Sequence, residues 1–226
     1  MNAVAHAPAF STEKARFNMV EQQIRPAEVL DQDVLDLLFV VKREEFVPAQ
    51  YRALAFSDTE IPLGRGVAML APRIEAHILQ AVQAKKHEKV LEIGAGSGYM
   101  AALLAAHADH VWTLEIDPDL AEMARRNLHR QGIDNVTVET ANGAVGLPAH
   151  APYDVIVVSG ALPELPQELK EQLKIGGRLF AIVGEAPVMT AVLVTRITAD
   201  SFRTVVLFET LAAPLSQVSA TAKFVF

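Results

Sequence analysis

Short apolar runs recur along the chain from Lys89 onward, and they alternate with segments of helical period. The apolar runs occupy residues 89–93, 111–116, 136–140, 153–159 and 178–183. Helices are predicted between them at 100–106, at 118–131 and at 165–173, the last closing at Gly176-Gly177. The run at 153–159 is almost wholly apolar, as expected of a strand that is covered on both faces. This alternation predicts parallel strands joined by crossover helices.

The pattern changes in the last third of the chain. Residues 189–198 and 202–211 are rich in β-branched and aromatic residues, and they flank Ala199-Asp200-Ser201, which is typical of a hairpin turn. We therefore predict an α/β fold: a doubly wound, mostly parallel, seven-stranded Rossmann-like sheet with an antiparallel C-terminal strand pair and added N-terminal helices.

The N-terminal part is predicted to be helical and then irregular. Phe17, Val20 and Ile24 share one face of a helix from Ser11 that stops at Arg25-Pro26. A second helix is capped by Asp31, and 42–45 is interpreted as its solvated end. Residues 49–71 carry Pro and Gly and read as an irregular connection, and a further helix starts at Pro72. The predicted divisions are a loose tail at 1–10, a helical and loop subdomain at 11–71, the main domain at 72–211 and a C-terminal tail at 212–226.

Composition excludes several classes of function. The 226 residues include 27 acidic and 20 basic side chains, a formal net charge of −7, which argues against a general nucleic-acid or membrane surface. There is no cysteine, so disulfides, thiol nucleophiles and thiolate metal sites are excluded. The seven histidines show no metal-ligand spacing, and no metal is predicted. The start lacks a signal-peptide pattern and no apolar run is long enough for a bilayer, so a cytoplasmic protein is expected.

Three features follow neighbouring strands at one edge of the predicted sheet. Gly94, Gly96 and Gly98 form a turn between strand and helix, where backbone N–H groups can approach a ligand closely. Glu115 ends the next strand and can accept hydrogen bonds from ribose hydroxyls. Asn142 follows the third strand and can pair with an adenine edge. Each has a purely structural alternative, namely a tight turn, a surface acid and an Asn-Gly turn. Together they favour a ligand that has ribose and adenine but no phosphate, and S-adenosyl-L-methionine is such a ligand.

Several stretches resemble one methyltransferase family. The residues that carry the resemblance are Glu21-Gln22-Gln23-Ile24-Arg25-Pro26, Arg43-Glu44-Glu45-Phe46-Val47-Pro48, Asp58 with Ile61-Pro62-Leu63-Gly64, Leu91 to Tyr99 (LEIGAGSGY), and Leu173 with Gly176-Gly177-Arg178-Leu179. The core resembles the class I S-adenosylmethionine-dependent methyltransferases. From about Met19 to Gly184 the chain is similar to the protein-L-isoaspartate O-methyltransferases, which methylate isoaspartyl carboxylates in damaged proteins.

The resemblance implies a set of site residues. The cofactor-binding residues it implies, with those of the three features above, are Glu92, Gly94, Gly96, Ser97, Gly98, Glu115, Ile116, Asn142 and Gly143. Asp58 is implied in the active site. The family's G-Q-T-I-S-x-P segment reads Gly66 to Pro72 (GVAMLAP) here, so Ala68 replaces the usual Thr and Leu70 replaces the Ser of the active site. The family's Asp that contacts adenine is Asn142, which keeps its hydrogen-bonding capacity.

Three functions are therefore compared. The first is methylation of isoaspartyl residues in a protein or peptide substrate, a repair reaction. The second is methylation of another acceptor, which the apolar Ala68-Met69-Leu70 segment would suit. The third is cofactor binding without catalysis, with 212–226 as a docking element; the alternative for that tail is a final strand or a core-packing segment. Nucleic-acid amino methylation is disfavoured because Ser159 to Pro163 (SGALP) lacks the [DNS]-P-P-[YF] motif. The oligomeric state, monomer or homodimer, is left open.

Overall fold

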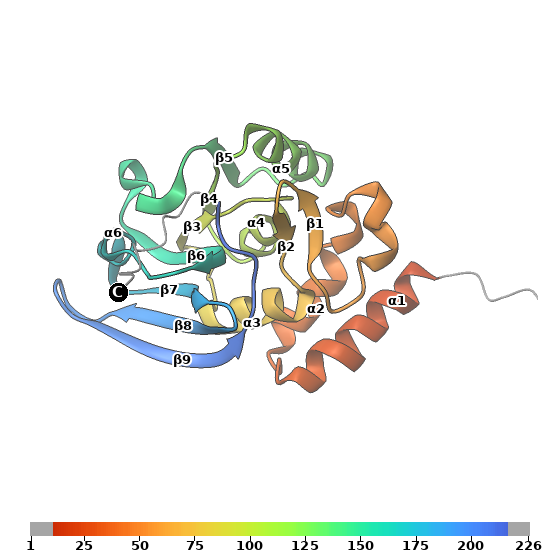
Figure 1. Cartoon of the computed structure of the whole chain (residues 1–226), viewed down its shortest axis with the longest axis horizontal. Helices are drawn as coiled ribbons and strands as arrows, with labels where there is room; N and C mark the ends of the chain where they lie inside the picture. Colours follow the sequence, from red (N-terminus) through yellow and green to blue (C-terminus); the bar gives the residue numbers. More distant parts are fainter. Residues whose placement is uncertain (1–10, 217–226) are drawn as a thin grey trace, which may run out of the picture.

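A seven-stranded sheet forms the centre of the computed structural model, which describes residues 11–216 (Figure 1). Its strand order is β5-β4-β3-β6-β7-β8-β9, with β3 to β7 parallel and β8 and β9 antiparallel. The strands are β3 (Lys89–Ile93), β4 (His110–Glu115), β5 (Val136–Thr140), β6 (Tyr153–Leu162), β7 (Leu173–Glu185), β8 (Val188–Arg196) and β9 (Phe202–Thr210). The predicted fold class is confirmed.

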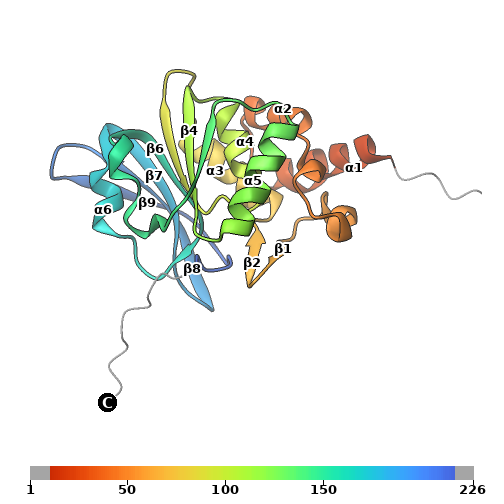
Figure 2. The same cartoon turned by 90° about the horizontal axis from the view of Figure 1, so that it is seen from above.

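Helices cover both faces of this sheet. Helices α3 (Pro72–Val82), α4 (Tyr99–Ala105) and α5 (Pro118–Arg130) lie on one face, and α6 (Gln167–Glu171) lies on the other (Figure 2). Burial on both faces explains why β6 is apolar along almost its whole length, and four of the five residues of β3 are also buried. Asp117 caps α5 as its sequence predicts, because its carboxylate accepts the backbone N–H groups of Asp119 and Leu120.

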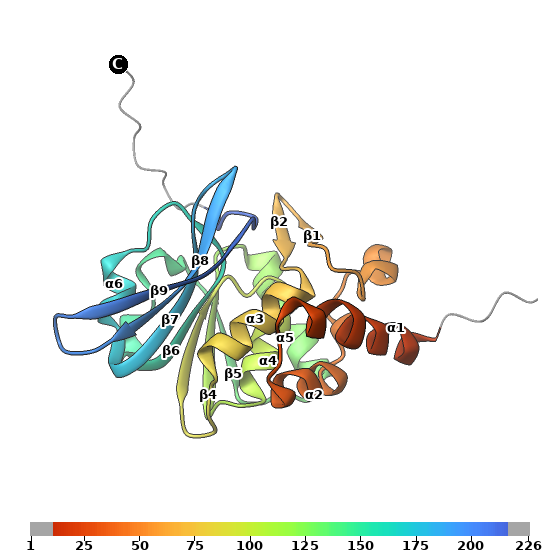
Figure 3. The ribbon, with the colours of Figure 1, turned by 90° about the horizontal axis from the view of Figure 1, so that it is seen from below.

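The N-terminal helices pack beside α3 (Figure 3). Helix α1 (Thr12–Asn18) continues as a π-helical turn at Met19–Ile24 and a 3-10 turn at Arg25–Ala27, and α2 (Gln32–Val40) follows. Val20 and Ile24 are fully buried, but Phe17 is 52% exposed and does not share their buried face. A helix loses its 3.6-residue period where a π-helical turn is inserted, so the predicted face does not extend back to Phe17. One cluster of buried apolar side chains includes residues of these helices, such as Met19 and Ile24, together with residues of the sheet, such as Val90 and Val155. The N-terminal helices therefore share a core with the sheet.

The predicted solvated helix end at 42–45 is wrong for its two central residues. Arg43 is 1% exposed, and Glu44 is buried against Arg16. The Arg43 guanidinium donates to Glu75 Oε2 at 3.1 Å, to the Ala55 carbonyl at 3.1 Å and to the Leu70 carbonyl at 2.6 Å. Four charges in a row are typical of a surface, but here tertiary partners satisfy Arg43 inside the protein.

The prediction that 49–71 is irregular is also wrong. Ala49–Leu54 forms a 3-10 helix, and β1 (Ile61–Gly64) pairs with β2 (Val67–Met69) in an antiparallel hairpin. Gly64, Arg65 and Gly66 at its tip all have positive φ. The strands are too short for a period-two pattern to be visible in the sequence, and Pro62 inside β1 hides it further.

The predicted helix at 165–173 is shorter than expected. Helix α6 ends at Glu171, and Gly176-Gly177 lies inside β7 instead of closing the helix. A Cβ on Gly177 would lie 2.9 Å from the Lys174 carbonyl oxygen and 3.0 Å from that of Tyr153. Close approach of backbone at the start of a strand, not a helix stop, therefore explains this glycine.

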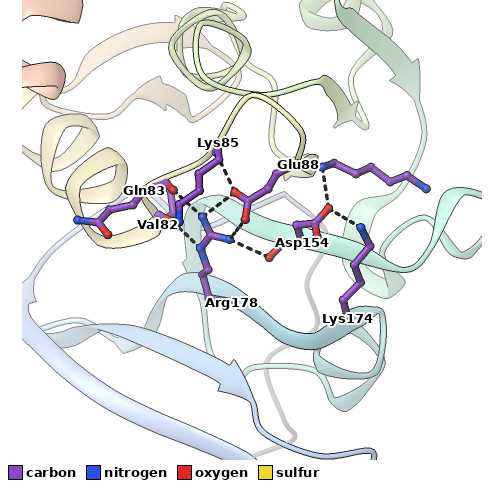
Figure 4. A network of polar contacts seen from close by, with 8 residues as sticks. Val82, Gln83, Lys85, Glu88, Asp154, Lys174 and Arg178 are labelled. Carbon is purple, nitrogen blue, oxygen red and sulfur yellow. Dashed lines mark hydrogen bonds and ion pairs between the residues drawn. The ribbon is translucent and has the colours of Figure 1, made fainter.

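A polar network holds the amino ends of the central strands, at the edge opposite the glycine turn (Figure 4). The Arg178 guanidinium donates to both carboxylate oxygens of Glu88, at 2.6 and 2.8 Å, and to the Gln83 carbonyl at 2.7 Å. Asp154 accepts from Lys174 Nζ at 2.6 Å and from the Lys89 N–H at 2.8 Å. Because these contacts join β3, β6 and β7 to the end of α3, they align the strands whose other ends form the site.

After β9 the chain crosses back over the sheet. The segment at 212–216, here called the C-terminal strap, passes between β6 and the β1–β2 hairpin (Figure 1). It exchanges hydrogen bonds with Ala161: Ala161 N–H donates to the Ala213 carbonyl, and Leu215 N–H donates to the Ala161 carbonyl, both at 2.9 Å. This part of the predicted C-terminal tail is packed. The rest of that tail, 217–226, and the predicted loose tail at 1–10 lie outside the described residues.

Candidate functional site

The glycine turn joins β3 to α4 at the carboxyl edge of the sheet. Gly94, Gly96 and Gly98 have φ of 95°, 50° and 84°, a region that residues with a Cβ seldom adopt. A Cβ on Gly96 would lie 3.1 Å from Leu63 of the hairpin, and one on Gly98 would lie 3.2 Å from the Ala124 Cα in α5. The turn is therefore compact because its neighbours from two other elements approach its backbone closely.

Glu115 lies beside this turn at the end of β4. It is 5% exposed, and its Oε2 accepts the Gly96 N–H at 2.8 Å while its Oε1 accepts the Asp117 N–H at 3.1 Å. Both carboxylate oxygens are thus held by backbone donors. Each oxygen has a second lone pair, so the carboxylate can still accept hydrogen bonds from a ligand.

A cleft opens at these strand ends. Its described lining is Val67, Ala68, Ile93, Gly94, Gly96, Leu114, Glu115, Ile116, Ala141, Asn142, Gly143, Ala144, Ser159, Gly160 and the strap residues Ala213, Pro214, Leu215 and Ser216. Six of the nine cofactor residues predicted from sequence line it together. Glu115 carries the one charged side chain of that lining.

Asn142 and Gly143 form the far wall of the cleft. The Asn142 side-chain oxygen accepts the Ala144 N–H at 3.0 Å, so it caps a short 3-10 helix at Gly143–Val145. The amide nitrogen of Asn142 remains as a donor for a ligand. A Cβ on Gly143 would lie only 2.5 Å from Ile93 Cγ2, so a glycine is needed there for the wall to close against β3.

Glu92 and Ser97 lie behind the turn and not in the cleft lining. Glu92 is fully buried, and its carboxyl accepts the hydroxyls of Thr113 at 2.6 Å and Ser159 at 2.8 Å. Burial raises the pKa of Glu92 to about 8, and the two hydroxyls oppose that rise. Ser97 is buried, and its carbonyl accepts the Asn127 side-chain amide at 2.9 Å. Both residues therefore support the turn from behind.

A second, smaller cavity adjoins the cleft. The two share Ala68, Gly94, Gly96 and Ser159, and the second cavity adds Leu70, Glu75, Glu92 and Tyr99. Leu70 is 5% exposed, so its side chain forms part of an apolar wall with Ala68 and Met69. Burial raises the pKa of Glu75 to about 7, and the Arg43 ion pair acts against that rise. The Tyr99 hydroxyl is buried and has no protein hydrogen-bond partner among the described residues.

Asp58 lies outside both cavities as the structure describes them. Its carboxylate accepts the backbone N–H of Arg73 at 3.3 Å and the Arg73 side-chain Nε at 2.9 Å. These contacts hold the first turn of α3, immediately after the segment that carries Leu70. A catalytic role for Asp58 stays a prediction.

Several residues around the cleft are absent from the sequence prediction. Thr113 and Ser159 bind Glu92, Arg43 holds the Leu70 carbonyl, and the strap residue Leu215 packs against Gly94 and Gly160. Ser159 could have been found from its place at the end of an apolar strand. The strap could not, because no motif connects 212–216 with β6.

The cleft combines a fixed carboxylate, an amide donor and apolar walls from Ile93, Leu114 and Ile116. No Lys or Arg lines the cleft within residues 11–216, so no side chain there neutralises a phosphate. This set of groups suits a nucleoside without a phosphate, because a carboxylate can accept hydrogen bonds from hydroxyls and apolar walls can pack against a base.

Comparison with known proteins agrees with this geometry. The profile of the Protein-L-isoaspartate(D-aspartate) O-methyltransferase (PCMT) family matches residues 14–219. The chain is 44% identical over 171 residues to a protein-L-isoaspartate O-methyltransferase of Methanoculleus marisnigri, covering 76% of this chain and 78% of that protein. It is 44% identical over 198 residues to protein-L-isoaspartate O-methyltransferase 1 of Rhodopseudomonas palustris, covering 87% and 80%.

A solved structure shows the same fold. A crystal structure described as a protein-L-isoaspartate O-methyltransferase from Plasmodium falciparum in complex with S-adenosyl-L-homocysteine superposes with a TM-score of 0.76. The match covers 92% of this chain and 99% of that chain at 21% identity. In the part of the chain that the structure describes, no helix is both long and apolar enough to span a bilayer.

Proposed function

The chain belongs to the protein-L-isoaspartate(D-aspartate) O-methyltransferase family, and we propose that it methylates the carboxylate of L-isoaspartyl residues in proteins. Its cofactor is S-adenosyl-L-methionine. The observation that carries the proposal is the buried Glu115 carboxylate, which the Gly96 N–H fixes in the wall of a cleft whose described lining has no cationic side chain.

Each side chain of the cleft has a proposed part in holding the cofactor. Glu115 accepts the two ribose hydroxyls, Ile116 and Leu114 pack against the adenine, and the Asn142 amide donates to its edge. Glycines at 94 and 96 let the backbone lie against the amino-acid part. When bound, the cofactor supplies an electrophilic methyl group on a positively charged sulfur. The shared border of the two cavities, at Ala68, Gly94 and Ser159, is where we place the acceptor group.

Methyl transfer to a carboxylate requires few catalytic groups from the protein. A carboxyl group with a pKa of ~4 is already ionised at neutral pH, so methyl transfer to it needs no general base. Alignment of the acceptor oxygen with the methyl group and exclusion of water supply the rate enhancement. The hairpin and the strap both line the cleft, and we propose that they exclude water from it.

The wall at Ala68 and Leu70 supports a second candidate, a methyl acceptor other than isoaspartate. Leu70 is buried in the lining of the second cavity, which adjoins the proposed acceptor position, and it offers no hydroxyl to a carboxylate. Apolar surroundings disfavour an anion. An acceptor with an uncharged group at this position would meet no such penalty.

Methyl transfer to a synthetic peptide separates the two candidates. A peptide with one L-isoaspartyl residue and its normal aspartyl twin are compared with radiolabelled S-adenosyl-L-methionine. Transfer to the isoaspartyl peptide alone supports the proposal. If neither peptide is labelled while S-adenosyl-L-homocysteine raises the melting temperature, the acceptor assignment fails and cofactor binding stands.

A double substitution then tests the role of the wall. Leu70→Ser with Ala68→Thr restores both hydroxyls of the family segment. One recovered hydrogen bond is worth ~1 kcal/mol, so activity on the isoaspartyl peptide should rise about fivefold or more. An unchanged or lower activity in a folded double variant would instead support the second candidate.

A further inference from the structure

The β1–β2 hairpin covers the cofactor cleft from outside the sheet. Val67 and Ala68 of β2 line the cleft, and the Leu63 side chain of β1 packs against Gly96 in the glycine turn. In Figure 1 the hairpin lies beside the carboxyl ends of β3 and β4. A cofactor that enters between hairpin and sheet has to pass this element.

The tip of the hairpin is tied to the start of α5. The Arg65 guanidinium forms ion pairs with Asp117 and with Asp119, the latter at 2.6 Å. Asp117 directly follows Glu115-Ile116 of the cleft wall, and its other carboxylate oxygen caps α5. Arg65 therefore spans from the cover of the cleft to the wall that carries the predicted ribose-binding carboxylate.

The base of the hairpin is hydrogen-bonded to the strap. Glu60 precedes β1, and its Oε1 accepts the Ala213 N–H of the strap at 3.1 Å. Ala213 and Leu215 are otherwise bound to Ala161 at the end of β6. The hairpin is thus held at its tip to α5 and at its base to the strap.

The ion pair of Arg65 with Asp119 is more exposed than the hydrogen bond of Glu60 with Ala213, which is partly buried. The Arg65 side chain is 64% exposed and that of Asp119 is 78% exposed, so water and salt compete for this ion pair. Glycines with positive φ flank Arg65 on both sides, and a Cβ on either would meet no atom within 4 Å, so the tip is not packed. An exposed ionic contact on an unpacked tip can open without disturbing the core.

We propose that the β1–β2 hairpin is a lid over the cofactor cleft and that Arg65 is a positioning residue that latches it to Asp117 and Asp119. This inference rests on the proposed function, because it requires a cofactor in the cleft. Opening the latch precedes cofactor exchange, so the latch slows release of the demethylated product. Salt weakens an exposed ion pair, so release becomes faster as ionic strength rises.

Dissociation of radiolabelled S-adenosyl-L-homocysteine tests the latch without any turnover. The wild type, Arg65→Ala and the control Arg126→Ala are compared in ~20 mM and ~0.5 M NaCl. Arg126 is also an exposed arginine in an ion pair, with Glu122 on α5, and it lies outside the cleft lining. We expect release from Arg65→Ala to be about two- to tenfold faster at low salt, the range for loss of two ion pairs of an exposed arginine, one with the exposed Asp119 and one with Asp117, whose side chain is 14% exposed. Its rate should no longer depend on salt, while the control behaves as wild type.

A charge exchange adds a readout that general loosening would not produce. Arg65→Glu alone should release the product faster still, because it faces two carboxylates. Adding Asp119→Arg should restore part of the slow release and its salt dependence. Failure of the exchange to slow release, or equal rates in wild type and Arg65→Ala, overturns the latch and leaves cofactor binding intact. Absence of any binding to the wild type overturns the proposed function as well.

Discussion

Glu92 is a fully buried carboxyl that has no ion pair with Lys or Arg in the described part of the chain. Its partners are two hydroxyls, and Glu115 and Glu75 are the nearby charges that further raise its pKa. In the cofactor-free protein we therefore expect Glu92 to carry a proton at neutral pH. Glu92→Gln replaces that neutral acid by a neutral amide of the same shape and removes the titration.

The direction in which pH changes the stability follows from the pKa of Glu92 in the unfolded and in the folded protein. Glu92 titrates near 4.5 in the unfolded chain and at about 8 in the folded protein. Between these values the folded protein holds a proton that the unfolded chain has lost, so stability falls as pH rises. Each pKa unit corresponds to ~1.4 kcal/mol, so three units between pH 5 and pH 8 amount to as much as ~4 kcal/mol. For a protein of this length that is roughly 10 °C in melting temperature.

Calorimetric melting of cofactor-free protein at pH 5, 6, 7 and 8 measures this difference. Glu92→Gln should melt close to the wild type at pH 5 and well above it at pH 8. The exposed Glu164→Gln is a matched control and should follow the wild type at every pH. Parallel curves for Glu92→Gln and the wild type would refute the reasoning, because Glu92 would then be ionised in the folded state.

Two further substitutions test the site and its support. Glu115→Ala removes a carboxylate that we assign to two ribose hydroxyls, so affinity for S-adenosyl-L-homocysteine should fall about 10- to 100-fold, measured by titration calorimetry; an unchanged affinity would contradict that assignment. Arg43→Met leaves Glu75 buried without its counter-charge and should lower the free energy of unfolding in urea by about 3–5 kcal/mol. Arg43→Met with Glu75→Leu should recover much of that loss, and a double variant as unstable as the single one would contradict it.

Much of the fold and part of the site could be predicted because their signals are local. The run at 153–159 is apolar whichever helices cover it, and Asp117-Pro118 starts a helix through its own capping chemistry. The prediction was wrong where distant partners decide the environment. Arg43 belongs to a charged run that is typical of a surface, yet it is buried because it forms an ion pair with Glu75, which is far along the chain.

The sequence alone determined the order of strands and helices from α3 onward, the glycine turn, Glu115 at the next strand end and the family to which the chain belongs. These properties depend on residue type and short spacing, which a chain carries before it folds. Only the tertiary structure decided which segments close the cleft. The contacts of Arg65 with Asp117 and of Glu60 with Ala213 join residues far apart in the chain, and no local pattern encodes such a pair. Their geometry exists only after the sheet has brought β4, β6, the hairpin and the strap to one edge.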